Sequence, residues 1–318
     1  MKNVTLKQLR IFAGVAKQLS FTRAASALYL TQPAVSSQIR LLEEALASRL
    51  FDRIGRSVRL TEAGRRLLDG VDAIEHTLER TDEALAGLRG AKTGTLKVGA
   101  INTANYFAAS LVNAFGASHP AITVRYTVDA TPEILSQLVQ SQTDLIIIGR
   151  APANINVVSE PFAKHPYVIA APPDHPLAKG KRVSLRRLFR ERYISREPGS
   201  AARIIMEGLA RKCGTPYEPQ MDSASNETIK QAVMAGIGIS CISGHTLSLE
   251  LLTRRLVTLR VEGFPVIRNW YAIHLRDRPL SPVAAAFRSY LTSHGAGIID
   301  RVLGQKPPRL TLRKNSGS

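Results

Sequence analysis

The decapeptide TQPAVSSQIR, residues 31–40, is rich in hydrogen-bonding side chains of small or medium size. Gln32 and Arg40 can bond to the edges of bases, and Ser36 and Ser37 can bond to phosphates or bases. On a helix these residues fall largely on one face, and their small size would let that helix approach the major groove of DNA closely. These residue types therefore favour contact with DNA.

Polar and basic residues recur later in the chain, directly after short apolar runs. Asn102 and Thr103 follow LKVGAI, and Arg150 follows LIIIG. Serine or asparagine at a helix start leaves backbone N–H groups free to bind an anion, and nearby arginines add charge. Singly, each residue fits a surface or capping role; together they favour an acidic or phosphorylated small molecule. The candidates for this binding are Asn102, Thr103, Tyr106, Arg150, Arg196, Ser200, Arg203, Asn226, Glu227, His245 and Thr246.

Sequence motifs typical of enzymes are missing. RGAKTG has a Lys-Thr pair without the spacing of a P-loop, GIGISC lacks the third glycine of a dinucleotide fingerprint, and no H-E-x-x-H occurs. The geometry of a Ser-His-Asp triad cannot be read from a sequence. The chain does lack the nucleophile-elbow motif that often carries the serine of such a triad. Cys213 and Cys241 alone support neither a disulfide framework nor a Cys-rich zinc site. We therefore expect no enzyme activity, no catalytic residue, no metal site and no cofactor.

The charge of the chain favours an anionic partner. The net charge is +18 over 318 residues, and residues 1–60 hold ten Lys and Arg against three acidic residues, which gives +7. No apolar run approaches the length of a transmembrane helix, and MKNVTLKQLR lacks the apolar core of a signal peptide. We expect a cytoplasmic protein without a membrane partner.

Three short helices would position the residues of the decapeptide. Thr5 begins a capping box before a helical apolar pattern, Ser20 opens a second helix, and Thr31 caps a third with Pro33 tolerated in its first turn. This is the order of a helix-turn-helix. A small helical bundle with a solvated basic face fits the periodicity equally well.

The segment LFDRIGRSVRLT, residues 50–61, predicts a wing. Two strand-like runs flank Gly55 and carry arginines that would contact the DNA backbone or the minor groove. With this segment included, the residues that we expect to contact DNA are Thr22, Thr31, Gln32, Pro33, Ser36, Ser37, Arg40 and Arg53.

A long helix should follow, from about Thr61 to Leu88. Its apolar residues recur with 4-3-4-3 spacing and one polar interruption at Thr81. Such a seam needs a partner, which is either another subunit or the chain's own second domain. Pairing of two subunits would set two recognition helices about 34 Å apart, as a palindromic site requires. Glycines 87, 90 and 94 are expected to end the helix and form a hinge.

From residue 95 onward, strands and helices alternate. Strands are expected at 96–101, 122–128, 145–149, 167–172, 192–195, 238–243 and 270–275, with helices at 104–117, 132–140, after Ser200, at 226–235 and at 281–291. This order implies a largely parallel sheet. Two small α/β lobes joined by two crossovers would form a ligand cleft at the carboxyl ends of strands.

The N-terminal residues resemble those of a known family. LKQLRIF, FTRAASALYLTQPAVSSQIRLLEEALASRLFDR and LTEAG are similar, with unbroken spacing over residues 6–64, to the winged helix-turn-helix of LysR-type transcriptional regulators. The resemblance implies an α/β protein: a winged helix-turn-helix at 1–62, a linker helix and hinge at 63–92, and a two-lobed domain similar to periplasmic binding proteins at 93–299. Its lobes would span about 93–166 with 268–299, and 167–267, before a disordered basic tail at 300–318.

Within that family, the C-terminal part resembles regulators of Calvin-cycle operons. The stretches that carry this resemblance are INTANYFAASLVNAF, REPGSAAR, SNETIKQAVMAGIGIS, SGHTLSLEL and EGFPVIRNWYAIHLRDRPLSPVAAAF. The resemblance implies activation of a carbon-fixation (RuBisCO) operon, with ribulose bisphosphate, phosphoenolpyruvate or NADPH as the effector. It also implies an interrupted palindromic operator, a homodimer or homotetramer, and contact with RNA polymerase.

Alternatives to this function remain open. A LysR-type regulator of another metabolic operon would take a non-phosphorylated acidic effector. A solute-binding protein would need export, and an architectural DNA binder would not need the two lobes. The effector, the operator sequence and the choice between dimer and tetramer are beyond the sequence.

Overall fold

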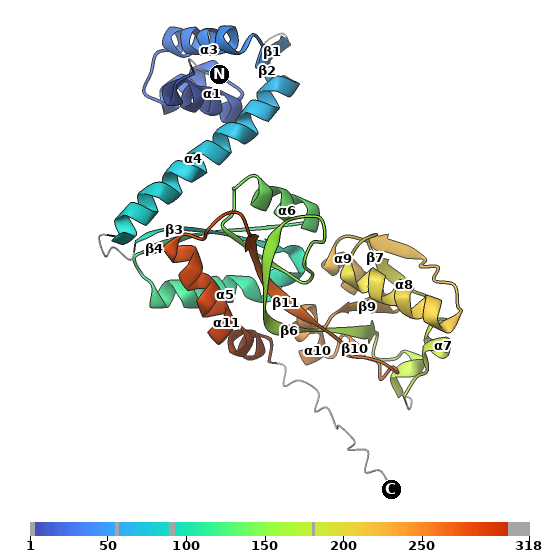
Figure 1. The fold of residues 1–318 in the computed structure, drawn as a ribbon. Helices are drawn as coiled ribbons and strands as arrows, with labels where there is room; N and C mark the ends of the chain where they lie inside the picture. Colours follow the sequence, from blue (N-terminus) through green and yellow to red (C-terminus); the bar gives the residue numbers. More distant parts are fainter. Residues whose placement is uncertain (1–3, 55–56, 89–92, 180–181, 305–318) are drawn as a thin grey trace. The chain divides into compact units, whose positions relative to one another are not determined.

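The computed structural model describes residues 4–54, 57–88, 93–179 and 182–304. The chain divides into two compact units, Met1–Ala91 with Val139–Thr143 and Lys92–Leu138 with Asp144–Ser318, called here the N-terminal and the C-terminal unit. Figure 1 labels most of the helices and strands of each.

Three helices of the N-terminal unit begin at the capping residues that the sequence predicts. Thr5 forms a full capping box with Gln8, while Ser20 and Thr31 each accept a hydrogen bond from a backbone N–H of the first turn. Pro33 lies in the first turn of the third helix, where its missing N–H costs no helical bond. The helices are α1 (Leu6–Gln18), α2 (Phe21–Ala27) and α3 (Gln32–Leu46).

A two-stranded wing follows α3. Strands β1 (Phe51–Ile54) and β2 (Ser57–Leu60) pair in antiparallel register. The Glu43 carboxylate accepts the backbone N–H groups of Leu50 and Phe51, at 2.7 and 3.3 Å, and so ties α3 to the wing. The turn that we expected at Gly55 and the side chain of Arg53 lie outside the described residues.

Helix α4 (Glu62–Leu88) forms as one continuous helix. Val71 is buried, and Leu67 and Ile74 pack with it into the core that α1–α3 share. The first half of the apolar seam is therefore used within the N-terminal unit itself, whereas Leu85 in the second half is 49% exposed. The helix is described as far as Leu88, the end that the sequence predicts, and Gly87 lies within it because a single glycine costs a helix only about 1 kcal/mol. Gly94 begins the next strand, and Gly90 lies outside the described residues.

Leu78, in the second half of the seam, provides a test of self-association. Leu78→Glu is expected to dissociate the assembly, because an apolar contact between subunits cannot accommodate an unpaired carboxylate. Sedimentation should show smaller species and DNA titrations should lose cooperativity. Thr77→Glu is the matched control, since Thr77 is exposed one position away on the same helix. An unchanged oligomer for Leu78→Glu would contradict the seam's role between subunits.

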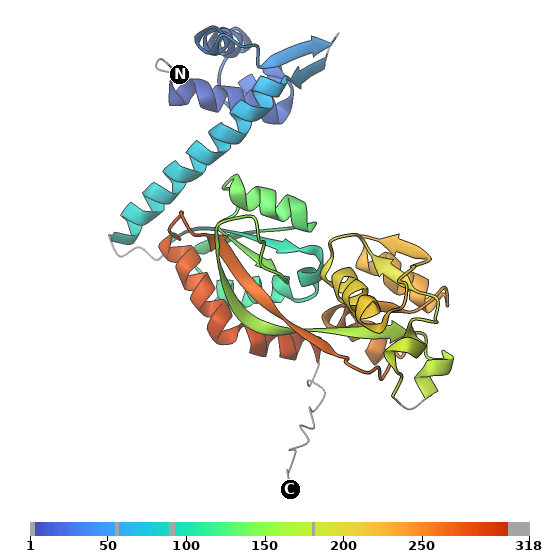
Figure 2. The same cartoon turned by 45° about the vertical axis from the view of Figure 1, so that its right-hand side comes forward.

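The first lobe of the C-terminal unit is a sheet covered on both faces. Leu145 and Ile147 face a core shared with α5 and α11, while Ile146 and Ile148 face α6, as the alternation of a strand requires. Figures 1 and 2 show α5 and α11 on the same side of this sheet. The elements are β3 (Gly94–Ile101), η1 (Asn102–Ala104), α5 (Asn105–Ser118), β4 (Ile122–Asp129), α6 (Thr131–Val139), β5 (Leu145–Ile148) and α11 (Pro282–Leu303).

Two long strands run through both lobes. β6 (Val157–Ala171) and β11 (Val266–Leu275) pair with each other in antiparallel register (Figure 2). In the described sheet, β3 is parallel to β4 and β5, but the pairings of β6 and β11 are antiparallel, so the expected largely parallel sheet is wrong. The sequence hides the first half of β6 because Pro161 and Pro166 interrupt it, and proline normally argues against a strand interior.

The second lobe is built around the far halves of these strands. Helices α8 and α9 pack on opposite faces, α8 against Ile169 and Cys241 and α9 against Ala170 and Ile242. The elements are η2 (Pro176–Lys179), α7 (Leu185–Leu188), β7 (Ile194–Arg196), α8 (Ala201–Cys213), β8 (Met221–Ser223), α9 (Asn226–Met234), β9 (Ser240–Ser243), η3 (Gly244–Thr246), α10 (Ser248–Leu252) and β10 (Val257–Thr258).

The chain returns to the first lobe through β11 and α11, as expected. However, α11 continues to Leu303, past Leu291 and past residue 299, where we expected the domain to end. The reason is an apolar face that persists, with Ile298, Ile299 and Leu303 buried in the first lobe's core. Residues 305–318 of the expected tail lie outside the described residues. Within the described part of the chain, no helix combines the length and apolar character that crossing a membrane requires.

Candidate nucleic-acid interface and small-molecule cavity

The polar face of α3 is accessible in the N-terminal unit. Thr31, Gln32, Pro33, Ser37 and Arg40 are exposed, and Ser36 is half-buried. Thr22 on α2 is exposed as well. The predicted residues with described side chains therefore lie at or near the surface, as direct contact with DNA requires.

The opposite face of α3 anchors the helix. Val35, Ile39 and Leu42 are buried in the core of the unit. Ala24 and Ala25 on α2 are also buried, and their small side chains permit close packing between helices. The polar residues of α3 are thus presented on a rigid element, which suits base recognition.

Two weak contacts orient polar side chains on the surface of α3. Gln32 Nε2 donates to Ser36 Oγ at 2.9 Å, which orients both side chains along one turn. Arg40 lies 3.7 Å from Glu44, and its side chain is 74% exposed. An ion pair this exposed contributes little, so the guanidinium can turn towards a base or phosphate at small cost.

A cavity of about 380 Å³ lies between the two lobes of the C-terminal unit. Four predicted residues line it: Thr103, Arg150, Arg196 and Ser200. The first lobe contributes residues that follow β3 and β5, and the second lobe contributes residues that follow β7. The cavity therefore lies where the rule about carboxyl ends of strands places a ligand.

One end of the cavity favours negative charge. Ser200 caps α8 by accepting the Arg203 backbone N–H at 3.3 Å, and Ala201 and Ala202 of the first turn also line the cavity. The free N–H groups and the dipole of this helix attract an anion. Arg150, which is exposed, adds a positive charge to the lining.

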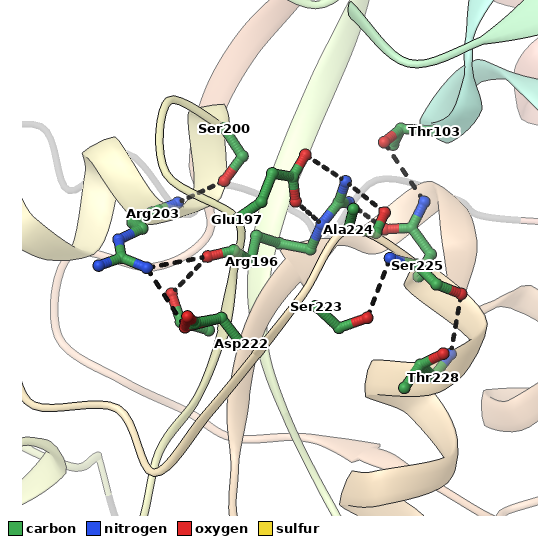
Figure 3. Close-up of polar contacts among 12 residues, drawn as sticks. Thr103, Arg196, Glu197, Ser200, Arg203, Asp222, Ser223, Ala224, Ser225 and Thr228 are labelled. Atoms are coloured by element: carbon green, nitrogen blue, oxygen red, sulfur yellow. Dashed lines mark hydrogen bonds and ion pairs between the residues drawn. The ribbon is translucent and has the colours of Figure 1, made fainter.

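Arg196 is 8% exposed, and most of its donors are already bonded. Its Nε and Nη2 donate to the two oxygens of Glu197 at 2.7 and 2.9 Å, Nη2 also donates to the Ala224 carbonyl at 3.1 Å, and Nη1 donates to Asn226 Oδ1. Figure 3 shows the guanidinium between Glu197 and Ala224. In this structure Arg196 is therefore engaged with protein groups rather than free.

Polar contacts join the two lobes beside the cavity. Asn226 Nδ2 donates to Thr103 Oγ1 at 3.4 Å, and the Tyr106 hydroxyl donates to Glu227. Lys230, which is 3% exposed, lies 2.7 Å from Glu227 and 4.9 Å from the centre of the Tyr106 ring. Asn226, Glu227 and Tyr106 thus connect the lobes and do not line the cavity.

Four further predicted effector residues also lie outside the cavity lining. Arg203 points towards Glu207 and Asp222, at 2.8 and 3.4 Å, because its place one turn into α8 turns it away (Figure 3). His245 and Thr246 are buried, and Asn102 is exposed in η1. The cavity lining does not include these four residues, and a role for them in effector binding stays a prediction from the sequence.

A buried aromatic cluster contacts residues of the cavity lining. His165 stacks on Trp270 with ring centroids 3.9 Å apart, and its Nε2 lies 2.8 Å from the hydroxyl of Ser243, a lining residue. Trp270 Nε1 donates to His245 Nδ1 at 3.0 Å. Burial lowers the pKa of His245 to about 4 and holds the pKa of His165 well below its ordinary value. Both rings are therefore neutral at pH 7.

Some lining residues were missed in the sequence. Thr131 begins α6 directly after β4, so the carboxyl-end rule that found Thr103 could have found it too. Tyr167 and Ile242 lie inside strands and carry no signal that distinguishes them from core residues. Tyr167 and Ile242 reach the cavity lining because β6 runs through both lobes and pairs with β9, and the sequence does not reveal the full length of β6.

Each of the two units matches the model of a known protein family. The model of the "Bacterial regulatory helix-turn-helix protein, lysR family" matches residues 6–65, and the "LysR substrate binding domain" matches residues 89–296. A RuBisCO operon transcriptional regulator of Allochromatium vinosum is 44% identical over 294 residues, 92% of this chain and 97% of the relative.

Solved structures with a similar fold agree with the family matches. The regulatory domain of CcmR from Synechocystis PCC6803, in complex with 2-PG, is 33% identical with a TM-score of 0.60, and the match covers 63% of this chain and 97% of that one. Full-length CbnR complexed with its target DNA is 21% identical with a TM-score of 0.69, over 91% and 99% of the two chains, which shows the fold. The chain therefore belongs to the LysR family of bacterial transcriptional regulators.

Proposed function

We propose that this LysR-type regulator activates a carbon-fixation operon when a small phosphorylated acid binds between the lobes of its C-terminal unit. The observation that carries the proposal is the cavity, whose lining includes both the N-terminus of α8 and Arg150. Both features recognise an anion of the size of a phosphate. The 44% identity to a regulator of a RuBisCO operon and the 33% identity to a domain complexed with 2-PG support the same assignment.

We propose that the residues that contact DNA are Thr22, Thr31, Gln32, Pro33, Ser36, Ser37, Arg40 and Arg53. For the effector we propose Thr103, Arg150, Arg196 and Ser200, which line the cavity. The operator would be an interrupted palindrome read by two α3 helices of a homodimer or homotetramer, which contacts RNA polymerase when active.

Control of transcription follows from differential affinity. An effector that binds one arrangement of the lobes better than another shifts the population towards that arrangement, and the free energy available equals the difference in affinity. The bonds from Asn226 to Thr103 and from Tyr106 to Glu227 are made between the lobes, so any change in lobe arrangement must break or remake them.

A second candidate is a regulator of another metabolic operon with a non-phosphorylated acidic effector. The apolar part of the lining favours it: Ile101, Leu135, Ile148 and Ile242 could pack against a hydrocarbon or aromatic acid. Both candidates need the same anionic contact at α8, and they differ in what the remainder of the ligand is.

The effect of Arg150→Ala tests the effector site. Loss of one charge-assisted bond of about 1.5–3 kcal/mol should weaken binding of 2-phosphoglycolate or ribulose bisphosphate about tenfold to a hundredfold. DNA binding without effector should be unchanged. Calorimetry gives the affinity, and fluorescence of Trp270, the one tryptophan in the sequence, gives a second signal from the core of the first lobe.

The matched control is Arg125→Ala, which removes an exposed arginine of β4 that is not part of the cavity lining. It should bind the same ligands as the wild type does. If only a non-phosphorylated acid such as muconate binds, the second candidate function replaces the first. If Arg150→Ala and the wild type bind the phosphorylated ligand equally well, the anion lies elsewhere.

A further inference from the structure

The cavity contains an acidic residue in a place that suits an anion. Glu197 lines it together with Arg196 and Ser200, next to the N-terminus of α8. A carboxylate at this end opposes the binding of any negatively charged effector by repulsion. The position of Glu197 therefore needs an explanation within the proposed function.

The explanation lies in the geometry of the Arg196–Glu197 pair. Both carboxylate oxygens of Glu197 accept bonds from the guanidinium, Oε2 from Nε at 2.7 Å and Oε1 from Nη2 at 2.9 Å. This two-bond fork is the arrangement in which arginine binds a carboxylate or phosphate of a ligand. The side chain of Arg196 is 10% exposed and that of Glu197 is 38% exposed, so the arginine is fixed while the glutamate borders solvent.

The other contacts of Arg196 hold the guanidinium in place without Glu197. The Ala224 carbonyl accepts from Nη2 at 3.1 Å, and Asn226, which is bonded to Thr103 of the other lobe, accepts from Nη1 (Figure 3). A departing Glu197 side chain would therefore leave a positioned guanidinium with its Nε edge free for another anion.

We propose that Glu197 is an internal competitor of the effector: its carboxylate occupies the edge of Arg196 that an anionic group of the effector takes, and effector binding displaces it into solvent. The proposal rests on the proposed function of the cavity and adds the way in which that cavity is regulated. Because Glu197 is tethered next to Arg196 in the sequence, it competes at a high effective concentration.

This competition selects the charge of the effector. A monoanion offers Arg196 no more than Glu197 already does, so the exchange yields little free energy. A ligand with a phosphate, or with two anionic groups, binds Arg196 and also reaches the N-terminus of α8 or Arg150, contacts that Glu197 does not provide. Glu197 thus sets a threshold that favours metabolites with a phosphate or two anionic groups over simple monocarboxylic acids.

Glu197→Gln is the direct test, with 2-phosphoglycolate and the monoanion glycolate as probes in calorimetry at 0.15 M salt. Removal of the competing charge should tighten binding of 2-phosphoglycolate about tenfold, which corresponds to the loss of one modest charge-assisted competitor. Glycolate should gain at least as much, so the preference for 2-phosphoglycolate over glycolate should not increase. Glu197→Ala, which also removes the residual acceptor of glutamine, should give the same result.

The matched control is Glu207→Gln. Glu207 is 37% exposed, pairs with Arg203 Nε at 2.8 Å, and is not a lining residue, so this change removes the same charge from a pair of the same kind outside the cavity. Its affinity for 2-phosphoglycolate should stay within about twofold of the wild type, because screening at this salt weakens distant charges.

The outcomes separate this proposal from the function on which it rests. If the wild type binds 2-phosphoglycolate and both Glu197 variants bind it no more tightly, Glu197 only positions Arg196 and the proposal is overturned, while the function stands. If Glu207→Gln tightens binding as much as Glu197→Gln does, a general charge effect replaces the competitor. If neither the wild type nor the variants bind any phosphorylated probe, both the proposal and the proposed function fall.

Discussion

Replacing Ser36, Ser37 and Arg40 together with alanine is expected to abolish specific operator binding and leave the weaker non-specific binding in place. Specific affinities typically exceed non-specific ones by about a thousandfold or more, which sets the size of the loss. The physical reason is that these side chains form the accessible polar face of α3, whose other face is buried in the core. Fluorescence anisotropy with operator and scrambled DNA measures both affinities.

The fold should survive this triple change. Serine to alanine favours a helix interior, and the ion pair of Arg40 with Glu44 is too exposed to matter for stability. Lys17→Ala is the control for charge: it removes one positive charge from the same unit, where Lys17 pairs with Asp72 at 3.1 Å. A triple variant that still gives the wild-type footprint would show that α3 does not read the operator.

The second large expected effect is a loss of stability at acidic pH. The C-terminal unit is expected to lose about 3 kcal/mol of its free energy of unfolding as the pH falls from 6.5 to 4, from His245 alone. The pKa of His245 is lowered to about 4 by burial, whereas in the unfolded chain it is near 6.5. Burial also lowers the pKa of His165, so this residue acts in the same direction.

The sign follows from proton counts. Between pH 6.5 and pH 4 the unfolded chain binds a proton at His245 and the folded chain does not, so lowering the pH favours unfolding. Above pH 6.5 neither state is protonated there, and this residue contributes no pH dependence. The structure agrees with a neutral ring in the folded chain, because His245 Nδ1 accepts the N–H of Trp270 at 3.0 Å.

Urea unfolding followed by Trp270 fluorescence at several pH values measures this effect in the C-terminal unit. His245→Gln should reduce the dependence of stability on pH by close to one proton between pH 5 and 6, even if the variant is less stable overall. His294→Gln, at an exposed position of α11, is the matched histidine control. Identical pH dependence in His245→Gln and the wild type would contradict the assignment.

Local signals in the sequence were enough for the helices of the N-terminal unit. Thr5, Ser20 and Thr31 cap helices where their side chains predict, because capping depends on neighbours only three residues away. The use of the α4 seam was harder to foresee. Val71 packs against α1 rather than a partner, and no local pattern tells one apolar surface from another.

The position of the cavity was predictable from the sequence, whereas the bonding partners of its charged residues were not. The carboxyl-end rule found Thr103, Arg150 and Ser200, since it depends only on strand order. It could not reveal that Arg196 is held by Glu197 and Asn226, which come together through the fold. Lys230 was also missed: its partner Glu250, at 2.8 Å, comes from α10, which the sequence analysis did not predict.

The most direct test of the central claim is a footprint of the wild-type protein on the promoter of the RuBisCO operon of its own organism, with and without 2-phosphoglycolate or ribulose bisphosphate. We expect protection of an interrupted palindrome, a change in that protection when the phosphorylated ligand is added, and no such change for Arg150→Ala. Protection that phosphorylated ligands leave unaltered, or no protection of this promoter at all, would contradict the assignment as an effector-controlled regulator of carbon fixation.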